Sequence, residues 1–213
     1  MTDNIILEGL KSFGVEKAED KAIVLSSYLD LVMSFNPSLK LVGEKERDEI
    51  ARRHILDSAS AYPVFLENTV AGDQIGDLGS GAGFPGIVLA ILFPDRNFVL
   101  IDRMTRRIGF LRIVKAKLNL ENVEILDKDI KDVKRNFRVI TCRAFRPLAE
   151  IGDEVVALTS SAILYKAVED NIEKELETLR SQGFVFNASI LPVSIPGEKV
   201  RRNIVVMKEW RKP

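Results

Sequence analysis

The chain has 213 residues, of which 46% are hydrophobic and 29% charged, and its 31 basic residues balance 31 acidic ones. This composition excludes a disordered chain. A single cysteine and a single histidine exclude an intramolecular disulfide framework and oppose a zinc site. The longest apolar run, residues 87–93, is shorter than the roughly 20 residues that span a bilayer, and the first four residues lack the basic start of a signal peptide. We expect a cytoplasmic protein with no metal site and no membrane contact.

The N-terminal part is predicted to be helical. Apolar residues recur at helical spacing over residues 6–13 and 23–32. Asn36-Pro37-Ser38 is predicted to break this pattern. A second helix is predicted from about residue 44 to 61, and Pro63 is predicted to close it.

After residue 70, short apolar runs alternate with longer segments of helical periodicity. The predicted strands are residues 74–78, 98–101, 123–126, 139–142 and 162–165, and the predicted helices include 85–92, 104–118 and 172–181. This alternation favours a parallel sheet with helices on both faces. Residues 184–193 and 203–210 are separated only by a Pro/Gly loop and should pair antiparallel. We predict an α/β fold with a mostly parallel seven-stranded sheet and an antiparallel last strand over residues 67–213, preceded by a helical extension over residues 1–66.

A glycine-rich stretch, Asp77-Leu78-Gly79-Ser80-Gly81-Ala82-Gly83-Phe84-Pro85-Gly86, lies where a predicted strand meets a predicted helix. Glycines there let the backbone approach a ligand closely. The pattern Gly81-x-Gly83-x-x-Gly86 also fits a dinucleotide site. However, Asp77 would repel a pyrophosphate and attract a sulfonium cofactor that carries an ammonium group. Asp102, after the next strand, is placed to accept hydrogen bonds from ribose hydroxyls. The stretch therefore favours S-adenosylmethionine over NAD or a glycine turn without a ligand.

The charges are distributed unevenly along the chain. Residues 103–146 contain thirteen basic and five acidic residues, an excess of eight positive charges that the rest of the chain offsets. No acid interrupts the basic residues Arg103, Arg106, Arg107, Arg112, Lys115 and Lys117. Such a run indicates a phosphate-binding flank beside the cofactor cleft, and a solvated helix face is the alternative.

Four segments make the chain resemble the small-subunit ribosomal RNA methyltransferase G family, also called the glucose-inhibited division protein B family. They are Arg53-His54-Ile55-Leu56-Asp57-Ser58, the glycine-rich stretch, Arg143-Ala144-Phe145 and Arg202-Asn203-Ile204-Val205-Val206-Met207-Lys208. The resemblance implies a Rossmann-like, S-adenosylmethionine-dependent methyltransferase that acts on N7 of a guanine in 16S ribosomal RNA. The implied partner is that RNA, the small ribosomal subunit or an assembly intermediate. We expect a monomer, because no coiled-coil pattern is evident.

The motif and the resemblance together give a set of candidate site residues. Arg143 and Arg202 would position the RNA, with no general base, because guanine N7 carries a lone pair and no proton. The cofactor would be bound by Asp77, Gly79, Gly81, Gly83, Phe84, Asp102, Ile130, Lys131 and Arg143. The chain departs from the family's usual pattern at Asp129, Lys131 and Arg138.

Two further residue types bear on alternative chemistry. The only histidine, His54, is predicted to fix helix packing rather than to catalyse, and Cys142 is predicted to pack in the core rather than to attack a pyrimidine. The alternatives to the guanine-N7 hypothesis are a methyltransferase of another RNA, a small molecule or a protein, a noncatalytic RNA-binding relative, and an NAD-dependent enzyme.

Overall fold

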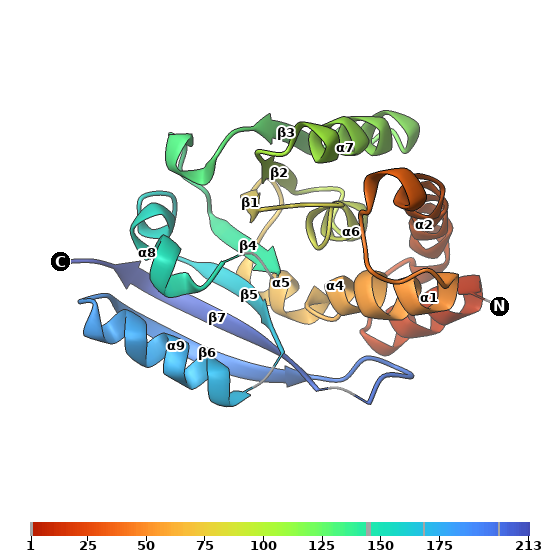
Figure 1. The fold of residues 1–213 in the computed structure, drawn as a ribbon. Coiled ribbons are helices and arrows are strands. Elements are labelled where there is room, and N and C mark those ends of the chain that lie inside the picture. Colours follow the sequence, from red (N-terminus) through yellow and green to blue (C-terminus); the bar gives the residue numbers. More distant parts are fainter. Residues whose placement is uncertain (1, 144–145, 168, 200) are drawn as a thin grey trace.

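A computed structural model describes residues 2–143, 146–167, 169–199 and 201–213 of the chain (Figure 1). Ala144 and Phe145, which belong to one of the four family-like segments, lie outside the described residues. In the part of the chain that the structure describes, no helix is long and apolar enough to cross a membrane.

The N-terminal part is helical, as predicted. Its elements are α1 (Thr2–Ser12), α2 (Ala18–Leu39), α3 (Arg47–Ile50), a π-helical turn η1 (Ala51–Leu56), α4 (Asp57–Ala59) and α5 (Tyr62–Asn68). Because α3, η1 and α4 follow one another directly, they form the second helical segment that the sequence predicts.

Two proline positions differ from the prediction. Helix α2 continues through Pro37, so the predicted break at Asn36-Pro37-Ser38 is wrong. Pro37 lies in the last turn, where it removes a single backbone donor, and the Lys40 N–H closes that turn by donating to the Asn36 carbonyl over 2.9 Å. Pro63 does not end a helix but lies in the first turn of α5. A proline is tolerated there because its missing N–H would have no partner inside the helix.

The rest of the chain forms a seven-stranded sheet, which confirms the predicted fold class. The strand order is β3-β2-β1-β4-β5-β7-β6. Strand β7 pairs antiparallel with both neighbours, and the other neighbouring pairs are parallel. The strands are β1 (Gln74–Leu78), β2 (Asn97–Asp102), β3 (Val123–Asp127), β4 (Val139–Arg143), β5 (Ala162–Lys166), β6 (Val185–Val193) and β7 (Arg202–Arg211). The helical elements between them are α6 (Gly86–Leu92), α7 (Thr105–Lys117), η2 (Ile130–Asp132), α8 (Leu148–Val156) and α9 (Glu169–Ser181), and neither η2 nor α8 is among the helices named from the sequence.

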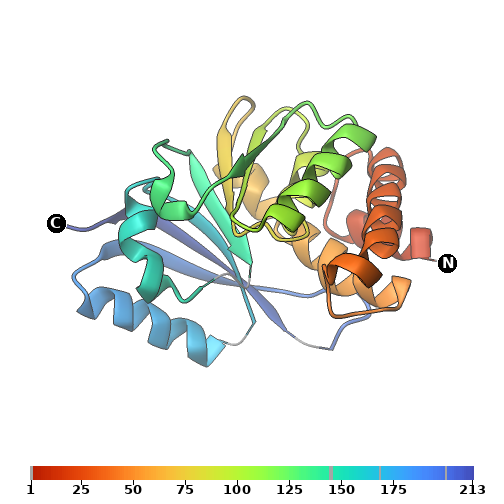
Figure 2. The ribbon, with the colours of Figure 1, turned by 45° about the horizontal axis from the view of Figure 1, so that its top comes forward.

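Helices cover both faces of the sheet (Figures 1 and 2), and each face has its own apolar core. On one face, Leu29 of α2 and Ile87 of α6 belong to the same buried cluster as Ile163 of β5. On the other face, Ile151 of α8 is buried in a cluster with Leu164 of β5. The N-terminal helices therefore share a continuous core with the sheet.

Helix α2 also reaches the loop between β1 and α6. The hydroxyl of Tyr28 donates a 2.6 Å hydrogen bond to the carbonyl of Ala82, and both residues are buried. The Tyr28 ring lies 5.2 Å from the ring of Phe84, measured between centroids. Because a buried carbonyl needs a donor, this contact helps to hold the glycine-rich loop in place.

We expect Tyr28→Phe to lower the free energy of unfolding by about 1–3 kcal/mol, because it leaves the buried Ala82 carbonyl without its donor. Urea denaturation measures this change. Tyr62→Phe is the matched control, since its ring contributes by stacking on Phe93 with centroids 4.8 Å apart. A Tyr28→Phe chain that unfolds at the same urea concentration as the native chain would contradict this role.

Candidate active site

The glycine-rich loop follows β1 and is shaped by two close contacts. Gly86 donates its N–H to Asp77 Oδ2 over 3.1 Å, and a Cβ at position 86 would lie 2.5 Å from the same oxygen. Gly83 has a φ of +100°, and a Cβ there would lie 2.5 Å from the side chain of Ile87. Both positions therefore require glycine.

Asp77 is a fully buried carboxyl group at the C-terminal end of β1. Burial is the main cause that raises its pKa to about 7. Oδ2 accepts the Gly86 N–H, whereas Oδ1 has no hydrogen-bond partner among the described residues. A buried carboxylate oxygen without a donor suits a ligand that brings a cationic or N–H group.

Asp102, at the end of β2, contacts the same loop. Its Oδ2 accepts the Gly81 N–H over 2.9 Å, its Oδ1 accepts the Met104 N–H over 2.8 Å, and Arg107 Nη1 lies 3.5 Å from Oδ2. The predicted ribose acceptor therefore also fixes the backbone of the loop. Each carboxylate oxygen can still accept a second hydrogen bond.

Two of the predicted cofactor residues, Ile130 and Lys131, lie on η2, the short turn after β3. Ile130 is buried and Lys131 is exposed. Asp129, one of the departures from the family pattern, accepts the Lys131 N–H over 3.4 Å and lies 3.0 Å from Arg103 Nη1. Asp129 thus has a local structural role at the start of this turn.

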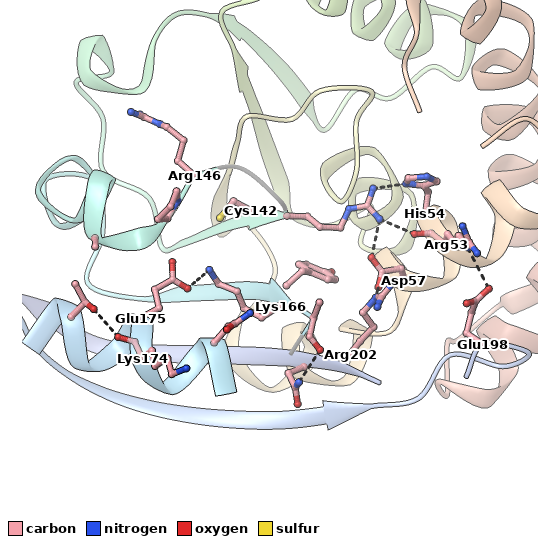
Figure 3. Close-up of a pocket in the computed structure, with 18 of the residues that line it drawn as sticks. Arg53, His54, Asp57, Cys142, Arg146, Lys166, Lys174, Glu175, Glu198 and Arg202 are labelled. Carbon is pink, nitrogen blue, oxygen red and sulfur yellow. Dashed lines mark hydrogen bonds and ion pairs between the residues drawn. The ribbon is translucent and has the colours of Figure 1, made fainter. Parts of the chain in front are cut away.

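A cavity of about 1000 Å³ is lined by the N-terminal helical segment, the end of β4, β5, α9 and the start of β7 (Figure 3). His54 and Asp57 project into it from the N-terminal helical segment, whereas Lys166 and Glu175 come from β5 and α9. Arg143 lines the cavity, and the other predicted cofactor residues do not belong to the described lining. The predicted site residues therefore fall into two adjoining groups, a cofactor group around the loop and a cavity group that includes Arg143 and Arg202.

The cavity group is organised around Asp57, which is buried. Asp57 Oδ2 accepts a 2.8 Å hydrogen bond from Arg143 Nη1 at the end of β4, and Oδ1 accepts a 3.1 Å hydrogen bond from Arg202 Nε at the start of β7. Arg143 Nη1 also donates to the Arg53 carbonyl over 3.0 Å. We call Asp57, Arg143 and Arg202 the arginine clamp.

His54 extends the arginine clamp to Phe84 of the glycine-rich loop. Its Nδ1 lies 2.7 Å from Arg143 Nη2, which can only donate, so Nδ1 accepts and Nε2 carries the proton that faces Glu44 Oε2 at 2.6 Å. Burial and, next, the charge of Arg143 lower the pKa of His54, in agreement with a neutral ring. The Phe84 ring lies 5.0 Å from the His54 ring and 5.2 Å from the Arg143 guanidinium.

Within the described residues, ion pairs are recorded for only part of the basic run, which begins at Arg103 and continues along α7. Arg103 pairs with Asp129, and Arg107 lies near Asp102. Arg106, Arg112 and Lys117 are exposed. These three exposed positions of α7 are therefore cationic.

The sequence did not identify Asp57 and Glu44 as site residues. The two arginines that bind Asp57 are 86 and 145 residues away in the chain, so no local pattern indicates those contacts. Glu44 is only 10 residues from its partner His54. The available signal was that Asp57 is the only acid in residues 50–66. The predicted packing role of His54 stays a prediction.

We expect Asp77→Asn to remove a pH-dependent destabilisation of the ligand-free protein. A carboxyl group whose pKa is higher in the folded chain (about 7) than in the unfolded chain (3.8) weakens folding as pH rises between these values. Relative to the native chain, the variant should be unchanged at acidic pH and gain up to about 4 kcal/mol above neutral pH. Urea unfolding across this pH range measures the difference, and a constant difference would contradict a raised pKa.

The sequence is similar to a known protein family over most of its length. Residues 22–204 match the family model described as GidB, rRNA small subunit methyltransferase G. The ribosomal RNA small subunit methyltransferase G of Treponema denticola is 32% identical, over 98% of this chain and 95% of the relative. That of Borrelia hermsii is also 32% identical, over 93% of this chain and 95% of the relative.

A solved structure supports the fold. M. jannaschii TYW2, determined in complex with AdoMet, aligns over 74% of this chain and 77% of its own with a TM-score of 0.53 and 14% identity. The match of the family model over most of the chain and the near-complete coverage of both relatives lead to one assignment. The chain belongs to the rRNA small subunit methyltransferase G family.

Proposed function

We propose that the protein transfers the methyl group of S-adenosylmethionine to N7 of a guanine in 16S ribosomal RNA. Family membership supports the methyltransferase class and the ribosomal RNA substrate. One structural observation supports placing the cofactor next to the guanine. Phe84 of the glycine-rich loop packs against Arg143 of the cavity, so a cofactor on the loop and a base in the cavity would adjoin.

The residues around the loop fit the cofactor. Asp77 Oδ1 is a buried acceptor without a described partner, which suits the ammonium group of the cofactor, and Asp102 retains acceptor capacity for ribose hydroxyls. When bound, S-adenosylmethionine supplies a methyl group activated by the positive sulfonium. The residues that would hold it are Asp77, Gly79, Gly81, Gly83, Phe84, Asp102, Ile130, Lys131 and Arg143.

The cavity group fits a guanine nucleotide without a general base. Guanine N7 has no proton to lose, so the protein has to align the base and hold its phosphates, and alignment alone supplies much of the rate. His54 agrees with this mechanism, because both of its ring nitrogens face partners, Arg143 and Glu44. Arg143 and Arg202 would hold guanine O6 or phosphate oxygens, which are acceptors only.

Several broader properties belong to the same proposal. The exposed cations of α7 would bind RNA phosphates outside the cavity. The substrate would be free 16S RNA, the small subunit or an assembly intermediate, in the cytoplasm, and the enzyme a monomer. Residues 1–66 would act as an extension of a methyltransferase domain over residues 67–213, and the shared apolar core would hold the two together.

Two variants should affect cofactor binding and methyl transfer separately. We expect Asp77→Ala to weaken the binding of S-adenosylhomocysteine at least about tenfold, because the variant removes the buried acceptor. Arg202→Ala should keep that affinity within about twofold and lower the rate of methyl transfer by about 100-fold. Calorimetry and radiolabelled methyl incorporation measure the two effects, and an unchanged rate in Arg202→Ala would remove Arg202 from the site.

The substrate assignment predicts a change in ribosomal RNA. Deleting the gene should abolish one N7-methylguanosine in 16S RNA, and expressing the native chain should restore it, whereas expressing Asp77→Ala should not. Chemical cleavage at N7-methylguanosine, followed by primer extension, locates the mark. If every N7 mark remains after deletion, the assignment to guanine N7 is wrong and another nucleotide or RNA is the substrate.

A further inference from the structure

Asp57 differs from the other carboxylates of the cavity because it binds two arginines from distant strands. Its side chain is 6% exposed, and its two oxygens bind Arg143 of β4 and Arg202 of β7. The other acids pair differently: Glu44 faces His54 and Arg53, Glu198 faces Arg53, and Glu175 faces Lys166. Asp57 is thus the acid of this cavity that joins both predicted RNA-positioning arginines.

The two arginines use their donors to different extents. A guanidinium has five N–H donors. Arg143 commits three of them, to Asp57, the Arg53 carbonyl and His54. Arg202 commits only its Nε–H, to Asp57, and within the described residues its four terminal donors have no recorded partner. Because Asp57 accepts the Nε–H of Arg202, the N–H groups on the two terminal nitrogens of Arg202 are left for a ligand in the cavity.

The charge of Asp57 also suits the proposed product. Methylation at N7 gives the guanine ring a positive charge that is absent in the substrate. Two arginines without Asp57 would place two positive charges beside that ring, whereas the arginine clamp carries a net charge of +1. Like charges a few ångströms apart in a partly buried site repel strongly. The carboxylate therefore lowers a repulsion that develops only as the methyl group is transferred.

We propose that Asp57 is a positioning residue for methyl transfer. It orients the terminal donors of Arg202 into the cavity and neutralises one of the two positive charges beside the guanine. This inference rests on the proposed function, because it assumes a base that becomes cationic. It assigns Asp57 no contact with the reacting atoms.

The test compares native chain, Asp57→Asn, Arg202→Ala and the double variant, with kcat normalised to the S-adenosylhomocysteine sites counted by calorimetry. We expect Asp57→Asn to lower kcat about tenfold or more, with KM for the RNA unchanged or lower, because the affected charge develops only in the transition state. In the Arg202→Ala background, Asp57→Asn should lower kcat by a smaller factor than in the native background, because no Arg202 remains to be oriented and only the loss of the carboxylate charge acts. Equal losses in both backgrounds, or a native kcat in Asp57→Asn, would overturn the proposal.

Two additional variants keep this test decisive. Glu124→Gln loses the ion pair with Arg135 on the surface, 2.7 Å long, and should leave kcat unchanged. If Asp57→Asn yields no folded protein, Arg202→Lys tests the same contact, because the Arg202 side chain is more exposed than that of Asp57. Lysine keeps the positive charge but lacks the planar guanidinium group. The kcat of this variant should fall about tenfold, and a native kcat would contradict the proposal. Methyl incorporation by the native chain is measured first, so a failure of the proposed function shows in that control.

Discussion

The hydrogen bond between Asp77 and Gly86 is the contact on which the arrangement of the site depends. It ties the buried end of β1 to the first residue of α6, and it leaves no room for a side chain at position 86. The loop between them is therefore short, tightly folded and rich in glycine. Because the loop is fixed at this point, Phe84 is presented to His54 and Arg143. One buried carboxyl group thus shapes both the cofactor group and its border with the cavity.

The N-terminal helices take part in the site as well as in the core. Helix α2 donates to the glycine-rich loop through Tyr28, and the π-helical turn η1 carries His54 and ends directly before Asp57. π-Helical turns are rare and frequently occur at functional sites. The cavity consequently forms between two parts of the chain that are separate in sequence. A sheet with these helices removed would lose one wall of the cavity and the carboxylate of the arginine clamp.

The fold could be predicted largely from local patterns, and the cavity could not. Buried parallel strands such as β1 and β5 are short apolar runs between turn residues, and the glycine spacing marks the loop directly. The two predictions that rested on Pro37 and Pro63 as helix breakers were wrong. Both prolines lie near helix ends, where the missing backbone N–H costs little. The contacts of Asp57 form because the ends of strands β4 and β7 both lie against helix α4. A single sequence gives no local pattern for this tertiary arrangement.

The reversed direction of β7 has a consequence for the order in which the molecule is completed. Strand β7 follows β6 in the chain but lies between β5 and β6 in the sheet, and β6 pairs with no other described strand. Because a ribosome delivers the chain from its N-terminus, the cofactor loop can form while the sheet is still open. Arg202 reaches the cavity only when β7 inserts and closes that gap. The nascent chain can therefore form its glycine-rich loop before Arg202 joins the arginine clamp.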